Sequence, residues 1–221
     1  MIELFYVKIN LQSELQDSSA LTEKEFAIAQ LITRIHRSAN GIKFGLSYPE
    51  LGYRTESAAP CLGTKINIFC KSKIDLAKIL DSSSVRRHVR DNFEISPIRS
   101  LKPNLYSGWE RFVRDRSMDK SSPSSRRRAV KRAKTFGRPS DNLSNFQNID
   151  RSNTLPFFEH LSNSTGTEES GPRMMKVFIR REPAVEPNSF DFNSFGLSNQ
   201  EQEAGASTYT ALPILKNFSY T

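Results

Sequence analysis

The sequence contains little cysteine and no long hydrophobic run. Its only cysteines, Cys61 and Cys70, form neither a zinc-binding nor a redox motif. We therefore expect the protein to be located in a reducing cytoplasm. No apolar run approaches the ~20 residues that span a bilayer, and we expect no membrane contact. Hydrophobic residues make up 37% of the 221 positions, enough for one large core or two small ones.

Charge of one sign is concentrated in a single stretch, from Trp109 to Arg138. This basic stretch carries 11 Lys or Arg and 3 acids, a net charge of +8, whereas the rest of the chain carries 32−11 = 21 bases and 24−3 = 21 acids. The whole excess therefore lies in thirty residues. Such segregation is typical of a protein that binds a phosphate backbone.

The centre of the basic stretch has the signals of a helix at both ends. Ser122 is a good N-cap before Pro123, and Gly137 followed by Pro139 ends the helix. A helix over residues 123–136 gathers its apolar residues on one side and most of its cations on the other. A solvated charged helix is the alternative, but no acid is interleaved between residues 120 and 135 to offset the repulsion.

Periodicity in the first half predicts the order β-α-β-β-α-β. The expected strands are residues 2–11, 42–48, 64–71 and 93–98, and the expected helices are 22–40 and a short one after Ser72 that ends at Leu80. This order indicates an N-terminal ferredoxin-like (RRM-like) domain over residues 1–100.

The second half, residues 101–221, is less regular. Side chains of two kinds alternate along residues 174–181, as they do in a strand, and residues 109–116 have strand or extended character. The polar composition of residues 137–153 predicts a loop. We expect residues 182–189 and 199–208 to be insertions. We expect an α+β fold, in which a C-terminal α/β domain carries the arginine-rich helix and binds RNA.

Four segments together resemble one protein family. They are Phe44-Gly45-Leu46-Ser47-Tyr48-Pro49-Glu50-Leu51, the basic helix, Leu161-Ser162-Asn163-Ser164-Thr165-Gly166 followed by Lys176-Val177-Phe178-Ile179-Arg180, and Phe195-Gly196-Leu197-Ser198. In this order the chain resembles the type I-F CRISPR repeat-processing endoribonucleases, the crRNA-maturation subunit of the Cascade or Csy complex.

The resemblance implies a reaction without metal or other cofactor, in which the RNA's own 2′-hydroxyl attacks the adjacent phosphate and leaves a 2′,3′-cyclic phosphate. His36 matches the family's catalytic histidine, Ser162 its active-site serine, and Ser164 a position beside the scissile bond. By itself, His36 would be interpreted as a partly exposed histidine at a helix end, and the serines as part of a turn. We do not assign His88, or His160 on its poorly defined segment, to the site.

The resemblance also implies that the basic helix enters the major groove of an RNA stem-loop. Arg114 and Arg116 would read the base pairs at the foot of the stem, since arginine pairs bidentately with guanine. Met175 and Phe195 stand where the family has an aromatic residue and a tyrosine, which predicts weaker stacking. The other expected RNA-binding residues are Lys120, Arg126, Arg127, Arg128, Lys131, Arg132, Lys134, Arg138 and Thr165.

The implied partners are the CRISPR repeat RNA hairpin and the other subunits of a type I-F complex and, in transposon-associated variants, a transposition-targeting protein. We expect a monomer when free, in a prokaryotic cytoplasm. Two alternatives stay open at this point. The chain could cap the hairpin without cutting it, or could be a basic RNA-binding protein of another kind, such as a ribosome-associated factor.

Overall fold

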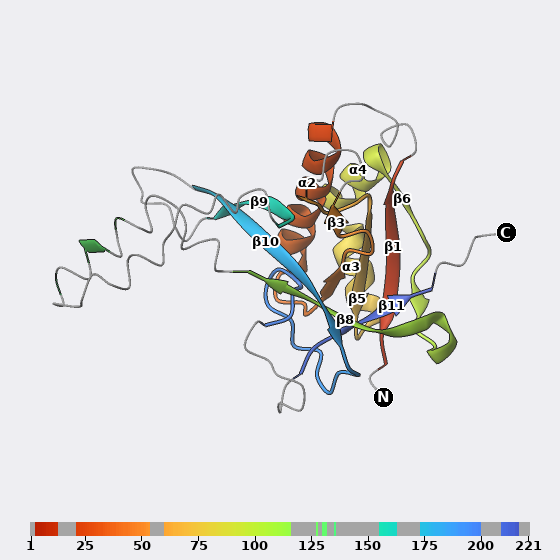
Figure 1. The fold of residues 1–221 in the computed structure, drawn as a ribbon. Helices are drawn as coiled ribbons and strands as arrows, with labels where there is room; N and C mark the ends of the chain where they lie inside the picture. Colours follow the sequence, from red (N-terminus) through yellow and green to blue (C-terminus); the bar gives the residue numbers. More distant parts are fainter. Residues whose placement is uncertain are drawn as a thin grey trace.

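The computed structural model describes residues 3–12, 21–53, 60–115, 155–162, 173–199 and 209–216, together with residues 127, 130, 131 and 135 (Figure 1). In these ranges the protein is mixed α+β, with three α-helices and two main antiparallel sheets. The expected α+β class is confirmed at this level.

The first sheet has the strand order β2-β5-β1-β6, and each neighbouring pair is antiparallel. Its strands are β1 (Phe5–Leu11), β2 (Gly45–Ser47), β5 (Lys65–Cys70) and β6 (Phe93–Ile95), and the short β7 (Arg99–Ser100) pairs with the beginning of β1. Along the chain these elements follow the β-α-β-β-α-β order that the sequence predicts, with the second helix split in two.

The helices of this half are α2 (Leu21–Ala39), α3 (Lys73–Asp81) and α4 (Ser83–Asn92). The side chain of Ser72 caps α3 as predicted, because its hydroxyl accepts a hydrogen bond from the amide of Asp75 at 3.2 Å. Helix α4 was not predicted. Its start is capped in the same way by Ser82, which accepts from the amide of Val85 at 3.4 Å.

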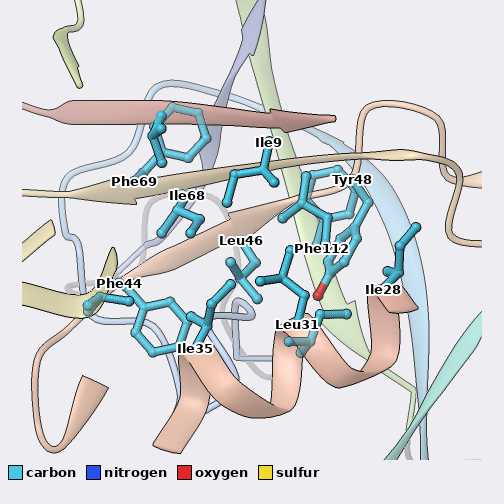
Figure 2. Close-up of a cluster of buried hydrophobic side chains, with 14 of the residues drawn as sticks. Ile9, Ile28, Leu31, Ile35, Phe44, Leu46, Tyr48, Ile68, Phe69 and Phe112 are labelled. Atoms are coloured by element: carbon cyan, nitrogen blue, oxygen red, sulfur yellow. The ribbon is translucent and has the colours of Figure 1, made fainter. Parts of the chain in front are cut away.

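The core lies between α2 and the first sheet (Figure 2). Ile28, Leu31 and Ile35, at helical spacing on α2, are at most 1% exposed and point toward strand residues such as Ile9 and Ile68. The apolar pattern of α2 also includes Phe26, which we expected on the same buried side of the helix, but Phe26 is 63% exposed. Phe26 therefore belongs to a second, outward-facing row on α2.

The second sheet has the order β11-β8-β10-β9, again antiparallel. Its strands are β8 (Tyr106–Arg114), β9 (Phe157–Ser162), β10 (Arg173–Ala184) and β11 (Leu212–Leu215). A 3₁₀ turn (η1, Pro103–Leu105) precedes β8, and β3 (Gly52–Tyr53) pairs with β4 (Pro60–Cys61). The predicted strands in residues 109–116 and 174–181 are confirmed, but β10 extends into the segment expected to be an insertion.

The tetrapeptide Phe-Gly-Leu-Ser occurs at residues 44–47 and again at 195–198, and the two copies lie against each other. The amide of Leu46 donates to the carbonyl of Gly196 at 2.8 Å. Gly196 has φ +70°, and a Cβ there would lie only 2.7 Å from a ring carbon of Phe44, so this close approach requires glycine. The contact fixes Phe195 beside the end of α2.

Candidate active site and RNA interface

His36 lies in the last turn of α2, one residue beyond the buried Ile35. The helix closes where Asn40 and Gly41 adopt φ values of 38° and 87° and the amide of Ile42 donates to the carbonyl of Ala39 at 2.7 Å. The His36 side chain is partly exposed, and its Nδ1 is buried without a hydrogen-bond partner among the described residues. Among the described residues, packing against neighbouring rings holds the His36 side chain.

Three rings from separate parts of the chain form a cluster at this point: His36 of α2, His160 of β9 and Phe195 of the segment after β10. The centroid of the His36 ring lies 5.0 Å from that of His160, at an interplanar angle of 79°, and 5.1 Å from that of Phe195, nearly parallel at 19°. The centroids of His160 and Phe195 are also 5.1 Å apart. We call these three residues the ring cluster.

Both imidazoles of the ring cluster have pKa values below the ordinary one. Burial lowers the pKa of His36, and the charge of Arg37 lowers it further. Burial also lowers the pKa of His160 to about 4, with contributions from the charges of His36, Arg37 and Arg114. Both rings are therefore mainly neutral at pH 7, the state in which an imidazole nitrogen can accept a proton.

Arg114, at the end of β8, extends the cluster toward the basic stretch. Its guanidinium carbon lies 5.9 Å from the centroid of Phe195, and its Nη2 lies 3.6 Å from the sulfur of Met175. Met175 in turn pairs with His160 in the β9–β10 register. The structure thus brings together four of the residues that the sequence predicts for the site: His36, Arg114, Met175 and Phe195.

The structure describes only part of the serine and threonine residues that the sequence predicts for the site. Ser162 is the last residue of β9, two residues beyond His160, and it pairs with Arg173. Its backbone therefore lies on the strand that contacts the end of α2 (Figure 1), whereas its side chain is outside the described part. Ser164 and Thr165 lie outside the described residues altogether.

The predicted basic helix is described at four positions, Arg127, Val130, Lys131 and Thr135, and all four are helical and exposed. The hydroxyl of Thr135 donates to the carbonyl of Lys131 at 2.9 Å. The remaining predicted RNA-binding residues lie outside the described part: Arg116, Lys120, Arg126, Arg128, Arg132, Lys134 and Arg138. Arg111 of the same basic stretch is buried and contacts Glu182 and Asn199, so it contributes to the fold.

His160 is the residue of the site that our sequence analysis missed. It lies on β9, a strand we did not predict, and it is 7% exposed in contact with His36. In the structure Phe158 and His160 are buried and Phe157 and Glu159 are more exposed, but the residue types Phe-Phe-Glu-His do not reveal this alternation. His88 is elsewhere, on α4, where its Nε2 lies 2.9 Å from the carbonyl of Ala27.

The part of the chain that the structure describes contains no group of three or more His, Cys, Asp or Glu side chains arranged to hold a metal ion. Among the described helices, none is both long enough and apolar enough to cross a membrane.

The described fold and site define an α+β protein with two imidazoles at a helix end and Arg114 of the basic stretch next to them, a combination suited to chemistry on nucleic acid. Comparison with protein-family models gives a match to the family described as CRISPR-associated protein (Cas_Csy4), over residues 6–213. The chain belongs to this family, the type I-F crRNA-processing endoribonucleases. No curated protein matches the chain.

Proposed function

We propose that the protein is a metal-independent endoribonuclease that binds the stem-loop of CRISPR repeat RNA and cuts the precursor at the base of the hairpin. The position of His36 carries this proposal. Its neutral ring lies at a helix end in a cluster with Phe195 and beside Arg114, within a family that processes precursor crRNA. A ferredoxin-like unit, residues 1–100, supplies the histidine, and residues 101–221 supply the hairpin-binding surface.

In the proposed reaction the RNA supplies its own nucleophile. His36 takes the proton of the 2′-hydroxyl, and the 2′-oxygen forms a bond to the adjacent phosphorus as the bond to the 5′-oxygen breaks. The 5′-oxygen takes up a proton, so the products are a 2′,3′-cyclic phosphate and a 5′-hydroxyl. Ser162 holds the 2′-hydroxyl or orients the imidazole, and Ser164 and Thr165 contact the RNA beside the scissile bond.

Recognition depends on the basic stretch. Exposed cations of its helix contact phosphates along the stem, and these contacts position the RNA without reading its sequence. Arg114 and Arg116 contact the base pairs at the foot of the stem. After cleavage the protein stays on the hairpin as a subunit of a type I-F complex in the prokaryotic cytoplasm.

A direct test compares the cognate repeat hairpin with an unrelated stem of equal length. We expect the protein to bind the cognate hairpin more tightly and to cut only that RNA. Equal binding to both RNAs, without cleavage, would favour a basic RNA-binding protein of another kind.

A hairpin-capping subunit without cleavage activity is the second candidate. Phe195 favours it, because the phenylalanine that stacks on His36 has no hydroxyl where the family has a tyrosine. The two candidates share the same binding predictions and differ in whether a cognate repeat is cut.

The pH dependence of cleavage should reflect the lowered pKa of His36. The base works only when it is neutral, so kcat/KM should rise with pH through the pKa of the free enzyme and then reach a plateau. Because burial and Arg37 lower that pKa, the midpoint should lie below 6.5. A pH profile with its midpoint above 6.5 would contradict this environment for His36.

Removing two exposed cations of the basic helix should weaken hairpin binding and reduce its salt dependence. Arg127 and Lys131 are four residues apart, so the double variant Arg127→Gln, Lys131→Gln removes neighbouring charges. The slope of log K against log salt should fall by about 0.9 for each lost phosphate contact. The matched control is Arg86→Gln, Arg90→Gln, an exposed pair with the same spacing on α4. An unchanged slope for the first variant would place the RNA elsewhere.

A further inference from the structure

A groove of about 520 Å³ runs along the outward side of α2. The wall that α2 contributes follows helical spacing: Phe26, Ala29, Gln30, Thr33, Arg34 and Arg37. From the first to the last of these positions the helix rises by about 16 Å, at 1.5 Å per residue. The groove is therefore an elongated feature rather than a small pit.

No residue of the ring cluster lines the groove, but residues next to the cluster in the sequence do. Arg37 follows His36 in α2, and on the opposite wall Glu159 precedes His160 in β9. Met174 of β10 also lines the groove and precedes Met175. Because neighbouring side chains of a strand face opposite sides, an RNA strand bound at the candidate active site would reach the groove by passing β9, the edge strand of the second sheet.

The groove exposes large apolar side chains that no described part of the fold covers. Phe26 is 63% exposed and Met174 is 59% exposed. The ring of Phe157 also lines the groove, and the Nζ of Lys176 lies 4.2 Å from the centroid of that ring. Aromatic rings beside cations are surfaces on which bases of single-stranded nucleic acid stack.

The charges at the groove favour an anionic occupant. Arg37 is exposed, and within the described part of the chain it has no ion pair. In the same part, Arg34 donates a hydrogen bond from Nη2 to Oε1 of Gln30 at 3.0 Å and has no carboxylate partner. The Nε of Arg34 is buried without a hydrogen-bond partner in the described part. Glu159 is the one acid in the described lining, so positive charge dominates the walls. An apolar partner helix would leave these guanidinium groups without counter-charges.

We propose that this groove binds the unpaired RNA strand that flanks the scissile phosphate. Bases of that strand stack on Phe26 and Phe157, and its phosphates contact Arg34 and Arg37. This proposal rests on the proposed function, because it takes the scissile phosphate to be at His36. It adds a second RNA-binding surface, separate from the basic helix, which holds the strand on one side of the reacting bond.

The test uses two hairpins with a 2′-deoxy nucleotide at the scissile position, so that neither is cut. One ends at the base of the stem and the other carries unpaired flanks, with 2-aminopurine placed in one flank at a time. We expect the flanked hairpin to bind the wild-type protein more tightly and its 2-aminopurine fluorescence to be quenched. Phe26→Ala should weaken binding of the flanked hairpin about 5- to 100-fold, the range for one lost stacking contact. Binding of the blunt hairpin should not change.

Ile74→Ala is the matched control, because Ile74 is 69% exposed on α3 and does not line the groove. Equal affinity of the wild-type protein for both hairpins would overturn the proposal, as would an equal effect of Phe26→Ala on both. An effect of Phe26→Ala on assembly with other subunits, with both hairpins bound normally, would assign the groove to a protein partner and would also overturn it. If instead neither hairpin binds better than an unrelated stem, the proposed function itself fails.

Discussion

Replacing His36 with alanine should reduce the single-turnover cleavage rate by about 10²–10⁴-fold, the usual contribution of a general base. Affinity for the hairpin should change little, because the proposed phosphate contacts are made by arginine and lysine side chains, which the substitution leaves in place. The measurement is the cleavage rate of a cognate hairpin at saturating protein, together with the Kd of a non-cleavable hairpin. Cleavage at the wild-type rate by the variant would show that His36 is not the base.

The matched control is His88→Ala. His88 is also partly buried with a lowered pKa, but it lies on α4 and contacts the backbone of α2 at Ala27. If His88 only supports the fold, His88→Ala protein that remains folded should cleave at the wild-type rate. Thermal unfolding of both variants separates loss of folding from loss of chemistry.

Replacing Arg181 with alanine should have the largest effect on stability. The Nε and Nη2 of Arg181 both lie 2.6 Å from Oε2 of Glu110, which is 3% exposed, and Ser47 donates to the other carboxylate oxygen at 3.2 Å. This arrangement joins β10 and β8 to β2 of the first sheet. The Arg181 side chain is itself 39% exposed, so only the Glu110 carboxylate of this pair is buried, and leaving it without its cation should cost about 1–3 kcal/mol. This corresponds to a fall in Tm of roughly 2–12 °C.

The pH dependence of that loss identifies its cause. Burial raises the pKa of Glu110, and Arg181 opposes this rise, so without the guanidinium the pKa should rise further. A carboxyl whose pKa is raised by folding favours the folded state at low pH and loses that contribution as pH rises through its folded pKa. The loss of stability in Arg181→Ala should therefore be smaller at pH 5 than at pH 8. A loss independent of pH would mean that packing of the Arg181 side chain, not its charge, is responsible.

The neighbouring Arg180 is the matched control. Its side chain is 43% exposed, a fraction close to that of Arg181. Its shorter contact, at 2.7 Å, is with Glu182, which is 30% exposed, whereas its contact with the buried Asp115 is longer, at 3.3 Å. Partly exposed pairs of this kind contribute about 0–1 kcal/mol. Arg180→Ala should accordingly cost less than Arg181→Ala. Similar losses in the two variants would contradict the special role of the pair with the buried Glu110.

The sequence predicted the elements that depend on local pattern. Strand β1, helix α2 with its end at Asn40–Gly41, the Ser72 cap and the alternation in β10 all follow from periodicity and end signals. Strand β9 was missed because its sequence, Phe-Phe-Glu-His-Leu-Ser, does not alternate between apolar and polar residues, and because its pairing with β10 spans residues 163–172. The exposure of Phe26 was missed for a related reason: the pattern of α2 does not show which of its apolar residues face the sheet.

The ring cluster could not be predicted from the sequence without the family resemblance. His36, His160 and Phe195 are far apart in the chain, and they meet only because α2 packs beside β9 and the Phe-Gly-Leu-Ser segments contact each other. The resemblance supplied His36 and Phe195 as site residues. It could not supply His160, whose contact with His36 depends on the tertiary arrangement of β9.

Cleavage of the cognate repeat hairpin in EDTA, with analysis of the new RNA ends, tests the central claim most directly. If His36 activates the RNA's own 2′-hydroxyl, the protein should cut once at the base of the stem without added metal. The hairpin product should then carry a 2′,3′-cyclic phosphate and the other fragment a 5′-hydroxyl. Loss of all cleavage in EDTA, or products with a 3′-hydroxyl and a 5′-phosphate, would contradict this account.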